Sequence, residues 1–84
     1  MSKVLSQTLS RTLIAKRDEL KLTQERTAEK LKVAVRTYQH WETGGTLPNS
    51  ANLLNILFIL DIDLIKFKQD LDNAGYIFRD KYDI

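Results

Sequence analysis

Residues 22–43 have the sequence LTQERTAEKLKVAVRTYQHWET, in which two short helical patterns stand only a few residues apart. The first begins at Thr23, whose hydroxyl can cap a helix N-terminus, and ends near Lys32. The second runs from Val35 to Thr43, where two glycines stop it. Because so short a connection cannot bring two helices antiparallel, they must cross steeply. The segment is therefore predicted to be a helix-turn-helix.

The second helix of this pair has two faces of different chemistry. At about 100° per residue, Tyr38 and Trp41 fall on one side, where they are expected to fill the core against Ala28 and Leu31. The opposite face carries Val35, Arg36, Gln39, His40 and Thr43. Arginine, glutamine and histidine offer the donors that recognise base edges in the major groove of DNA. The alternative is an ordinary solvated face, and the neighbouring short helix favours DNA recognition over it.

The rest of the chain, apart from a loop at residues 43–49, is also predicted to be helical. The expected elements are residues 7–20 after a cap at Ser6, residues 50–60 after Pro48, and a helix that starts after a cap at Asp63 and ends before Gly75. This gives an all-α, five-helix domain over residues 1–72 and a C-terminal tail over residues 73–84. From residue 76 the tail is compatible with a short strand, an extended arm or a frayed end.

The composition restricts the class of protein. A chain of 84 residues suits one domain, and the absence of cysteine excludes disulfides and thiol chemistry. The longest apolar run, Ile56 to Leu60, is far below the roughly 18 residues of a membrane span, and no signal peptide is evident, so we expect a cytoplasmic protein. With one histidine and no phosphate-binding glycine loop, no catalytic set can be assembled, and we expect no enzyme activity, cofactor or metal.

The charges are unevenly distributed along the chain. Residues 1–50 contain nine basic and five acidic side chains, whereas residues 51–84 contain four basic and six acidic ones. A basic half on a small domain favours a polyanionic partner, because each neutralised phosphate releases counterions. Many charge clusters are simply solvated, so this pattern supports DNA binding only together with the helix-turn-helix.

Several short motifs in and around this segment are typical of one known family. They are Leu22-Thr23-Gln24-Glu25, Ala28-Glu29-Lys30-Leu31, Val33, Trp41-Glu42-Thr43-Gly44 and Leu47-Pro48, followed by Leu53-Leu54-Asn55-Ile56 and Leu60-Asp61-Ile62-Asp63-Leu64. From about Leu9 to Phe67, the chain thus resembles the XRE (Cro/C1-type, phage-repressor-like) helix-turn-helix family. The resemblance implies a five-helix, lambda-repressor-like DNA-binding domain, commonly a homodimer that regulates transcription from a palindromic operator.

The resemblance also implies a role for individual residues. The positions that match the family's DNA contacts are Gln24 at a phosphate, Val35, Arg36, Gln39 and His40 at bases, Thr37 and Thr43 nearer the sugar-phosphate backbone, and Gly44, Gly45 and Thr46 in a loop whose N–H groups contact phosphates. Chemically, Arg36 suits guanine, Gln39 suits adenine, and Val35 suits a thymine methyl group. His40 can donate to a guanine or a phosphate, or be merely solvated. Arg17 and Glu42 match a structural ion pair of the family, the alternative being two unrelated surface charges.

Three positions in the helix-turn-helix depart from the family's pattern. Lys32 replaces the usual glycine of the turn, so a left-handed backbone there would be strained, or the turn would differ. Ala34 replaces a serine or threonine cap, which forgoes about 1 kcal/mol at the start of the recognition helix. Thr27 replaces a leucine, and we expect Tyr38 and Trp41 to compensate for the smaller side chain.

The helix at residues 50–60 is apolar nearly all round because of Phe58 and Ile59, so something must cover its outer surface. One candidate is a second copy docked through Phe58 and Ile65, which would set two recognition helices about 34 Å apart. The other candidate is the chain's own tail, in which Tyr76, Ile77, Phe78 and Tyr82 could fold back over this helix or exchange between two subunits as a paired strand. We favour the dimer, since doubling supplies the base contacts that one small domain lacks.

These observations together predict a sequence-specific DNA-binding transcriptional regulator, in the form of a repressor that binds a palindromic operator as a homodimer. The alternative is an antitoxin-type interaction module that binds a partner protein through its C-terminal part.

Overall fold

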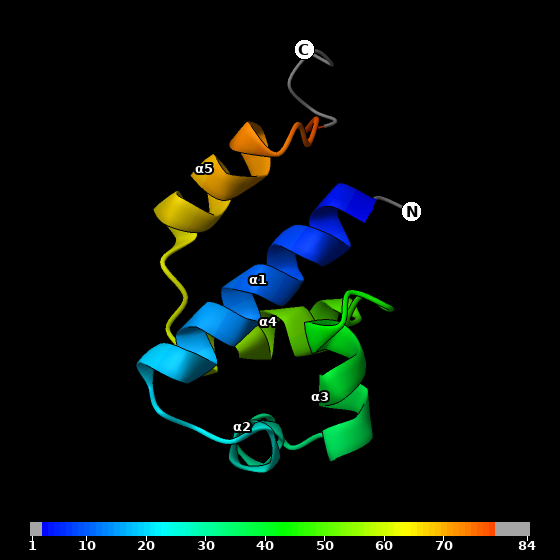
Figure 1. The fold of residues 1–84 in the computed structure, drawn as a ribbon, viewed down its shortest axis with the longest axis vertical. Coiled ribbons are helices and arrows are strands. Elements are labelled where there is room, and N and C mark those ends of the chain that lie inside the picture. The colour runs from blue at the N-terminus through cyan, green and yellow to red at the C-terminus, as the bar shows by residue number, and fades with distance from the viewer. Residues whose placement is uncertain (1–2, 79–84) are drawn as a thin grey trace.

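The computed structural model describes residues 3–78, and these residues form five α-helices and no strand (Figure 1). The helices are α1 (Lys3–Glu19), α2 (Gln24–Leu31), α3 (Val35–Glu42), α4 (Ser50–Ile59) and α5 (Leu64–Asn73). The predicted all-α, five-helix fold is confirmed. The short connection between α2 and α3 makes these two helices cross steeply, as the sequence predicted.

The helix N-termini show which capping predictions were right. The Thr23 hydroxyl accepts a hydrogen bond from the Arg26 N–H at 3.0 Å, and the Asp63 carboxylate caps α5 in the same way. Ser6 was wrongly predicted to be a cap. It lies inside α1, where its hydroxyl donates to the Lys3 carbonyl at 3.2 Å. A serine hydroxyl can bond to a carbonyl of the preceding turn, so serine does not by itself mark a helix start.

A single core connects the helices of the helix-turn-helix with α1 and α4. Its buried members are Leu9, Leu13, Ala28, Leu31, Tyr38, Trp41, Ile56, Leu60 and Ile62. The rings of Tyr38 and Trp41 meet edge to face with their centroids 6.3 Å apart, so both point inward as predicted. Thr27 is fully buried, and its hydroxyl donates to the Thr23 carbonyl at 2.8 Å. The smaller side chain therefore carries no unsatisfied polar group into the core.

The turn between α2 and α3 keeps a left-handed residue although that residue is a lysine. Lys32 has a φ of 57°, and the Val33 N–H donates back to the Ala28 carbonyl at 3.1 Å. Lys21 after α1 and Asp61 after α4 have the same φ. A side chain in this region costs roughly 1–2 kcal/mol, so these helix ends are held by the packing of the helices that follow. The N-cap of α3, Ala34, makes no side-chain hydrogen bond.

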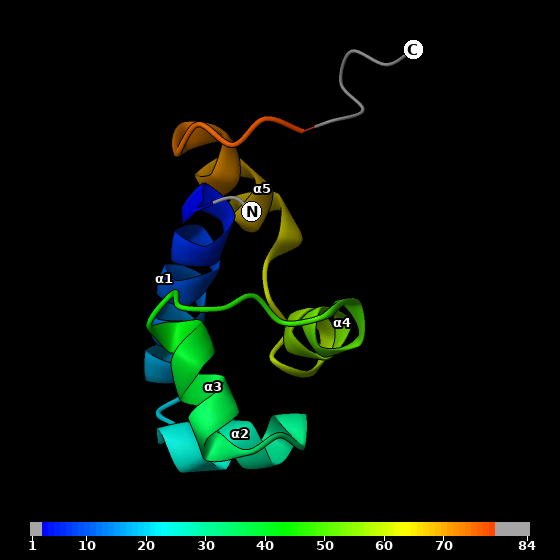
Figure 2. The ribbon, with the colours of Figure 1, turned by 90° about the vertical axis from the view of Figure 1, so that its right-hand side faces the viewer.

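Only the first residues of the C-terminal tail belong to the described structure, and they continue from the C-terminal end of α5 (Figure 2). The Tyr76 and Phe78 rings meet with their centroids 4.9 Å apart, and the Lys68 ammonium of α5 lies 5.5 Å from the centre of the Phe78 ring. The side chain of Ile77 is exposed. The predicted contribution of Tyr82 falls outside the described residues.

We predict that Lys32→Gly raises the free energy of unfolding by about 1 kcal/mol, because glycine adopts the left-handed conformation without the clash of a Cβ. Urea unfolding followed by circular dichroism measures the change. Lys30→Gly is the matched control: it removes the same charge from an exposed position within α2 and should lower the stability by about 1 kcal/mol. Equal destabilisation by both substitutions would contradict the assignment of strain to Lys32.

Candidate nucleic-acid interface

The outer face of α3 is open to solvent while its inner face is buried. Exposed side chains on α3 and at its end are those of Arg36, Thr37, His40 and Thr43. Gln39 is half-buried. Val35, the first residue of α3, is also half-buried and packs against the core, because it lies beside the turn from α2. The structure thus places the predicted base-facing residues on one side of α3, with Val35 at the boundary between that face and the core.

The buried carboxylate of Glu42 lies directly behind this face. Its side chain is 5% exposed and receives the Arg17 guanidinium, with Nε at 2.6 Å from one oxygen and Nη2 at 3.1 Å from the other. The Tyr38 hydroxyl also donates to this carboxylate. Arg17 uses its remaining nitrogen, Nη1, to donate to the Leu22 carbonyl at 3.2 Å. The two residues assigned to a structural ion pair are therefore in contact, and the pair joins α1 to the last residue of α3.

Gln24 and Gln39 extend this cluster to the surface. Gln24 Nε2 donates to the Glu42 carboxylate at 2.9 Å, and Gln39 Nε2 donates to Gln24 Oε1 at 3.0 Å. We use the name Glu42 cluster for Glu42, Arg17, Tyr38, Gln24 and Gln39. Two of its members are predicted DNA contacts, one at the start of α2 and one on α3. The Glu42 cluster therefore couples the two helices at the surface where DNA is expected.

The Glu42 cluster shifts the pKa values of its ionisable members. Burial by itself raises the pKa of Glu42, but hydrogen bonds from Arg17, Tyr38 and Gln24 outweigh it, so this pKa lies below its ordinary value of 4.5. Burial, together with the hydrogen bond to the carboxylate, raises the pKa of the Tyr38 hydroxyl above its ordinary value. The hydrogen bond to Glu42 raises the pKa of Arg17. Glu42 is therefore an anion over the whole neutral range.

The loop after α3 supplies fewer free backbone donors than the sequence suggested. Gly44 has a φ of 77°, which ends α3 as predicted. Its N–H donates to the Trp41 carbonyl, and the Gly45 N–H donates to the His40 carbonyl at 3.1 Å. These bonds close the end of the helix. Gly45 and Thr46 are exposed at this end of α3, and their contact with phosphate stays a prediction.

Two hydrogen bonds to Glu42, one from Tyr38 and one from Ser10, were not predicted from the sequence. Tyr38 was predicted only as a core ring, although its hydroxyl lies four residues before Glu42 on the same helix, a spacing that brings side chains together. Ser10 was not singled out, yet its hydroxyl donates to the Glu42 carbonyl from α1. No local pattern marks this second contact, because the two residues are 32 positions apart.

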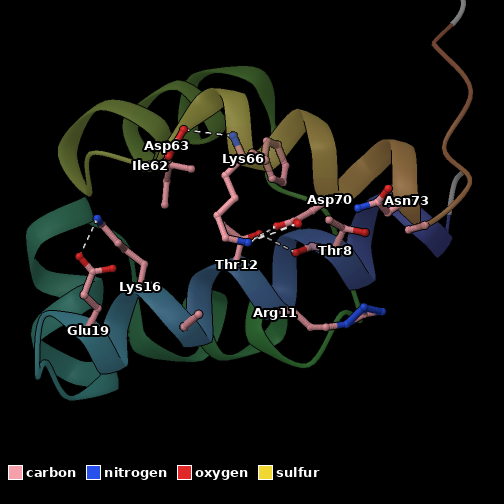
Figure 3. Close-up of a pocket in the computed structure, with 13 residues that line it drawn as sticks. Thr8, Arg11, Thr12, Lys16, Glu19, Ile62, Asp63, Lys66, Asp70 and Asn73 are labelled. Carbon is pink, nitrogen blue, oxygen red and sulfur yellow. Dashed lines mark hydrogen bonds and ion pairs between the residues drawn. The ribbon is translucent and has the colours of Figure 1, made fainter.

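A cavity of about 530 Å³ lies between α1 and α5, away from the Glu42 cluster (Figure 3). Three basic and three acidic side chains line it, together with Ala15, Ile62, Phe67 and other small or polar residues. The ammonium of Lys66 lies 3.2 Å from the Asp70 carboxylate, and that of Lys16 lies 3.4 Å from Glu19. Because the charges lining this cavity balance, it adds no strong electrostatic field to the face presented by α3.

The fold and this exposed, donor-bearing helix define a helix-turn-helix DNA-binding protein. A family model described as helix-turn-helix matches residues 13–67, which is more than half of the chain. The chain belongs to the XRE-type helix-turn-helix family and is a DNA-binding transcriptional regulator of that type. No curated protein and no solved structure matches the chain significantly. Within residues 3–78, no helix is both long enough and apolar enough to cross a membrane.

The lowered pKa of Glu42 predicts acid sensitivity of the fold. A carboxylate whose pKa is lower in the folded state stabilises the protein fully above its unfolded-state pKa. That contribution is lost as the pH falls from about 4.5 through the folded-state value. We expect the free energy of unfolding to drop over this range, and the drop to be smaller in Glu42→Gln. Urea unfolding between pH 3 and pH 7 tests this, with Glu29→Gln, an exposed residue of α2, as the control. A Glu42→Gln profile parallel to that of the wild type would contradict the prediction.

Proposed function

We propose that this regulator is a repressor that binds a palindromic operator as a homodimer, with α3 as the helix that reads the bases. The observation that carries the proposal is the exposed face of α3, whose polar side chains stand on a helix fixed from behind by the Glu42 cluster. A rigid helix with exposed donors is suited to the major groove, since base recognition needs side chains in set positions. Occupation of an operator then blocks transcription.

Arg36 is the residue best suited to direct readout. It is exposed on α3, and it forms none of the ion pairs found within residues 3–78. Its guanidinium is therefore available to donate two hydrogen bonds to O6 and N7 of a guanine. His40, one turn along the same face, is also exposed, as are Thr37 and Thr43. These three are proposed to bind a base or the sugar-phosphate backbone on either side of Arg36.

The exposed apolar surface of α4 and α5 supports the dimer. Phe58 is 68% exposed and Ile65 is 73% exposed. Leu54, Ile59 and Leu64 expose about half of their side chains on the same two helices. Large apolar side chains exposed to this extent are unfavourable in water, and their concentration on two successive helices is typical of an interface. A second copy is the proposed partner, because a two-fold dimer presents two α3 helices to the two halves of a palindrome.

We expect Arg36→Ala to weaken binding to the preferred operator by roughly 1–3 kcal/mol while leaving the fold intact, because it removes a two-point contact with guanine. The operator is first selected from a random DNA pool, and affinities are then measured by fluorescence anisotropy. Arg11→Ala is the matched control, since it removes the same charge from an exposed position on α1. Equal losses in the two variants would show that charge alone matters and would contradict the role of α3.

We expect Phe58→Asp and Ile65→Asp to convert the dimer into a monomer and to abolish the cooperative occupation of both half-sites. Each places a charge in the proposed interface, where it would lose hydration without a partner. Analytical ultracentrifugation gives the mass of each variant, and circular dichroism checks its fold. Ile77→Asp, at an exposed residue of the tail, serves as the control. A wild-type protein that binds its operator as a monomer would contradict the dimer, and a different co-purifying protein would favour the antitoxin-type alternative.

A further inference from the structure

We infer that hydrogen bonds passing from Glu42 through Gln24 to Gln39 fix the direction of the Gln39 amide, and that this direction makes Gln39 select adenine over guanine. The inference rests on the proposed role of α3 in base recognition. It adds that the choice of base depends on a side chain of α2 and on a buried carboxylate, neither of which needs to touch that base.

The Glu42 carboxylate determines which group donates in each of these hydrogen bonds, because an ionised carboxylate can only accept them. Each of the side-chain groups in contact with its carboxylate is a donor: the Arg17 guanidinium, the Tyr38 hydroxyl and the Gln24 amide. An ionised carboxylate has no hydrogen to give, so the group of Gln24 that faces it must be the NH2. The two ends of a glutamine amide are otherwise interchangeable in shape, and this contact makes them distinct.

The orientation of Gln24 then determines that of Gln39. With its nitrogen 2.9 Å from Glu42, Gln24 has its oxygen free to accept, and Gln39 Nε2 donates to that oxygen at 3.0 Å. A Gln39 amide turned the other way would place two acceptor oxygens against each other. Because oxygen atoms without a hydrogen between them repel, the orientation set at the buried end is passed on to the half-buried residue of α3.

The fixed amide leaves Gln39 with one acceptor and one donor for DNA. Its Oε1 and its second N–H remain available, and adenine offers the matching amino group at N6 and acceptor at N7. Guanine offers two acceptors, O6 and N7, so a two-point contact with guanine would require both hydrogens of the Gln39 NH2. One of these hydrogens is already held by Gln24. Guanine is therefore disfavoured as long as Gln24 keeps its orientation.

The test compares adenine with guanine at the base pair that Gln39 contacts. The operator selected from a random pool is varied at each base pair, and affinities are measured by anisotropy with the full-length protein. The pair in contact is the one whose base preference is lost in Gln39→Ala. At that pair we expect the wild type to favour adenine over guanine about tenfold, in line with a two-point base contact.

Substitution of Gln24 should weaken the preference for adenine over guanine even though Gln39 itself is unchanged. In Gln24→Ala and in Gln24→Met, which keeps the length of the side chain, the Gln39 amide can turn over, and we expect the ratio to fall to about threefold or less. Loss of a phosphate contact by Gln24 would weaken binding to both duplexes equally and leave the ratio unchanged. Gln69→Ala, at an exposed glutamine of α5, is the control and should keep the wild-type ratio.

The outcomes separate this inference from the proposed function. Failure to enrich any operator would overturn sequence-specific recognition and the inference with it. An enriched operator whose base preferences all survive in Gln39→Ala would overturn the inference alone, as would a wild-type preference for guanine. A tenfold preference that persists in folded Gln24→Ala and Gln24→Met would show that Gln39 needs no support from Gln24, which also overturns it.

Discussion

The buried carboxylate of Glu42 is the group on which the recognition surface depends. It receives donors from α1, from the start of α2 and from α3 itself, so one anion fixes the relative positions of the three helices. A buried charge is costly unless its hydrogen-bonding capacity is used, and here each carboxylate oxygen has at least one donor. The contacts that offset the cost of burying this charge also hold α3 in its orientation relative to α1 and α2.

The core and the Glu42 cluster hold α3 in different ways. The Tyr38 and Trp41 rings hold the helix in place through burial of apolar area, which is strong but not directional. Hydrogen bonds to Glu42 add direction, since each requires a donor at a particular distance and angle. Tyr38 takes part in both, with its ring in the core and its hydroxyl on the carboxylate. Lys21 and Lys32, which have a left-handed backbone, lie at the two chain connections that join α1 to α2 and α2 to α3.

Local interactions account for most of what could be predicted. Thr23, Asp63 and Gly44 act within a few residues of their own positions, and each marks a helix boundary correctly. Ser6 misled because the same hydroxyl chemistry is available inside a helix, where no sequence signal distinguishes it. Helical periodicity assigned Tyr38 and Trp41 to the core and Arg36 to the surface. Periodicity did not predict that Val35 packs against the core. Val35 lies between the two faces of α3 and was predicted only as a base contact.

The sequence by itself determined the five helices, the steep crossing of α2 and α3, and the two faces of α3, because caps, turns and periodicity act over a few residues. Only the tertiary structure decided how polar side chains pair. Gln24 meets Gln39 across 15 positions, and Ser10 meets Glu42 across 32. The Arg17–Glu42 pair, across 25 positions, was expected, but only from the resemblance to a known family. The tertiary structure also decided that Ile56 is buried while Phe58, on the same apolar helix, stays exposed. The physical reason is that a hydrogen bond or a buried contact depends on distances of a few ångströms between helices, which are set only when the helices pack.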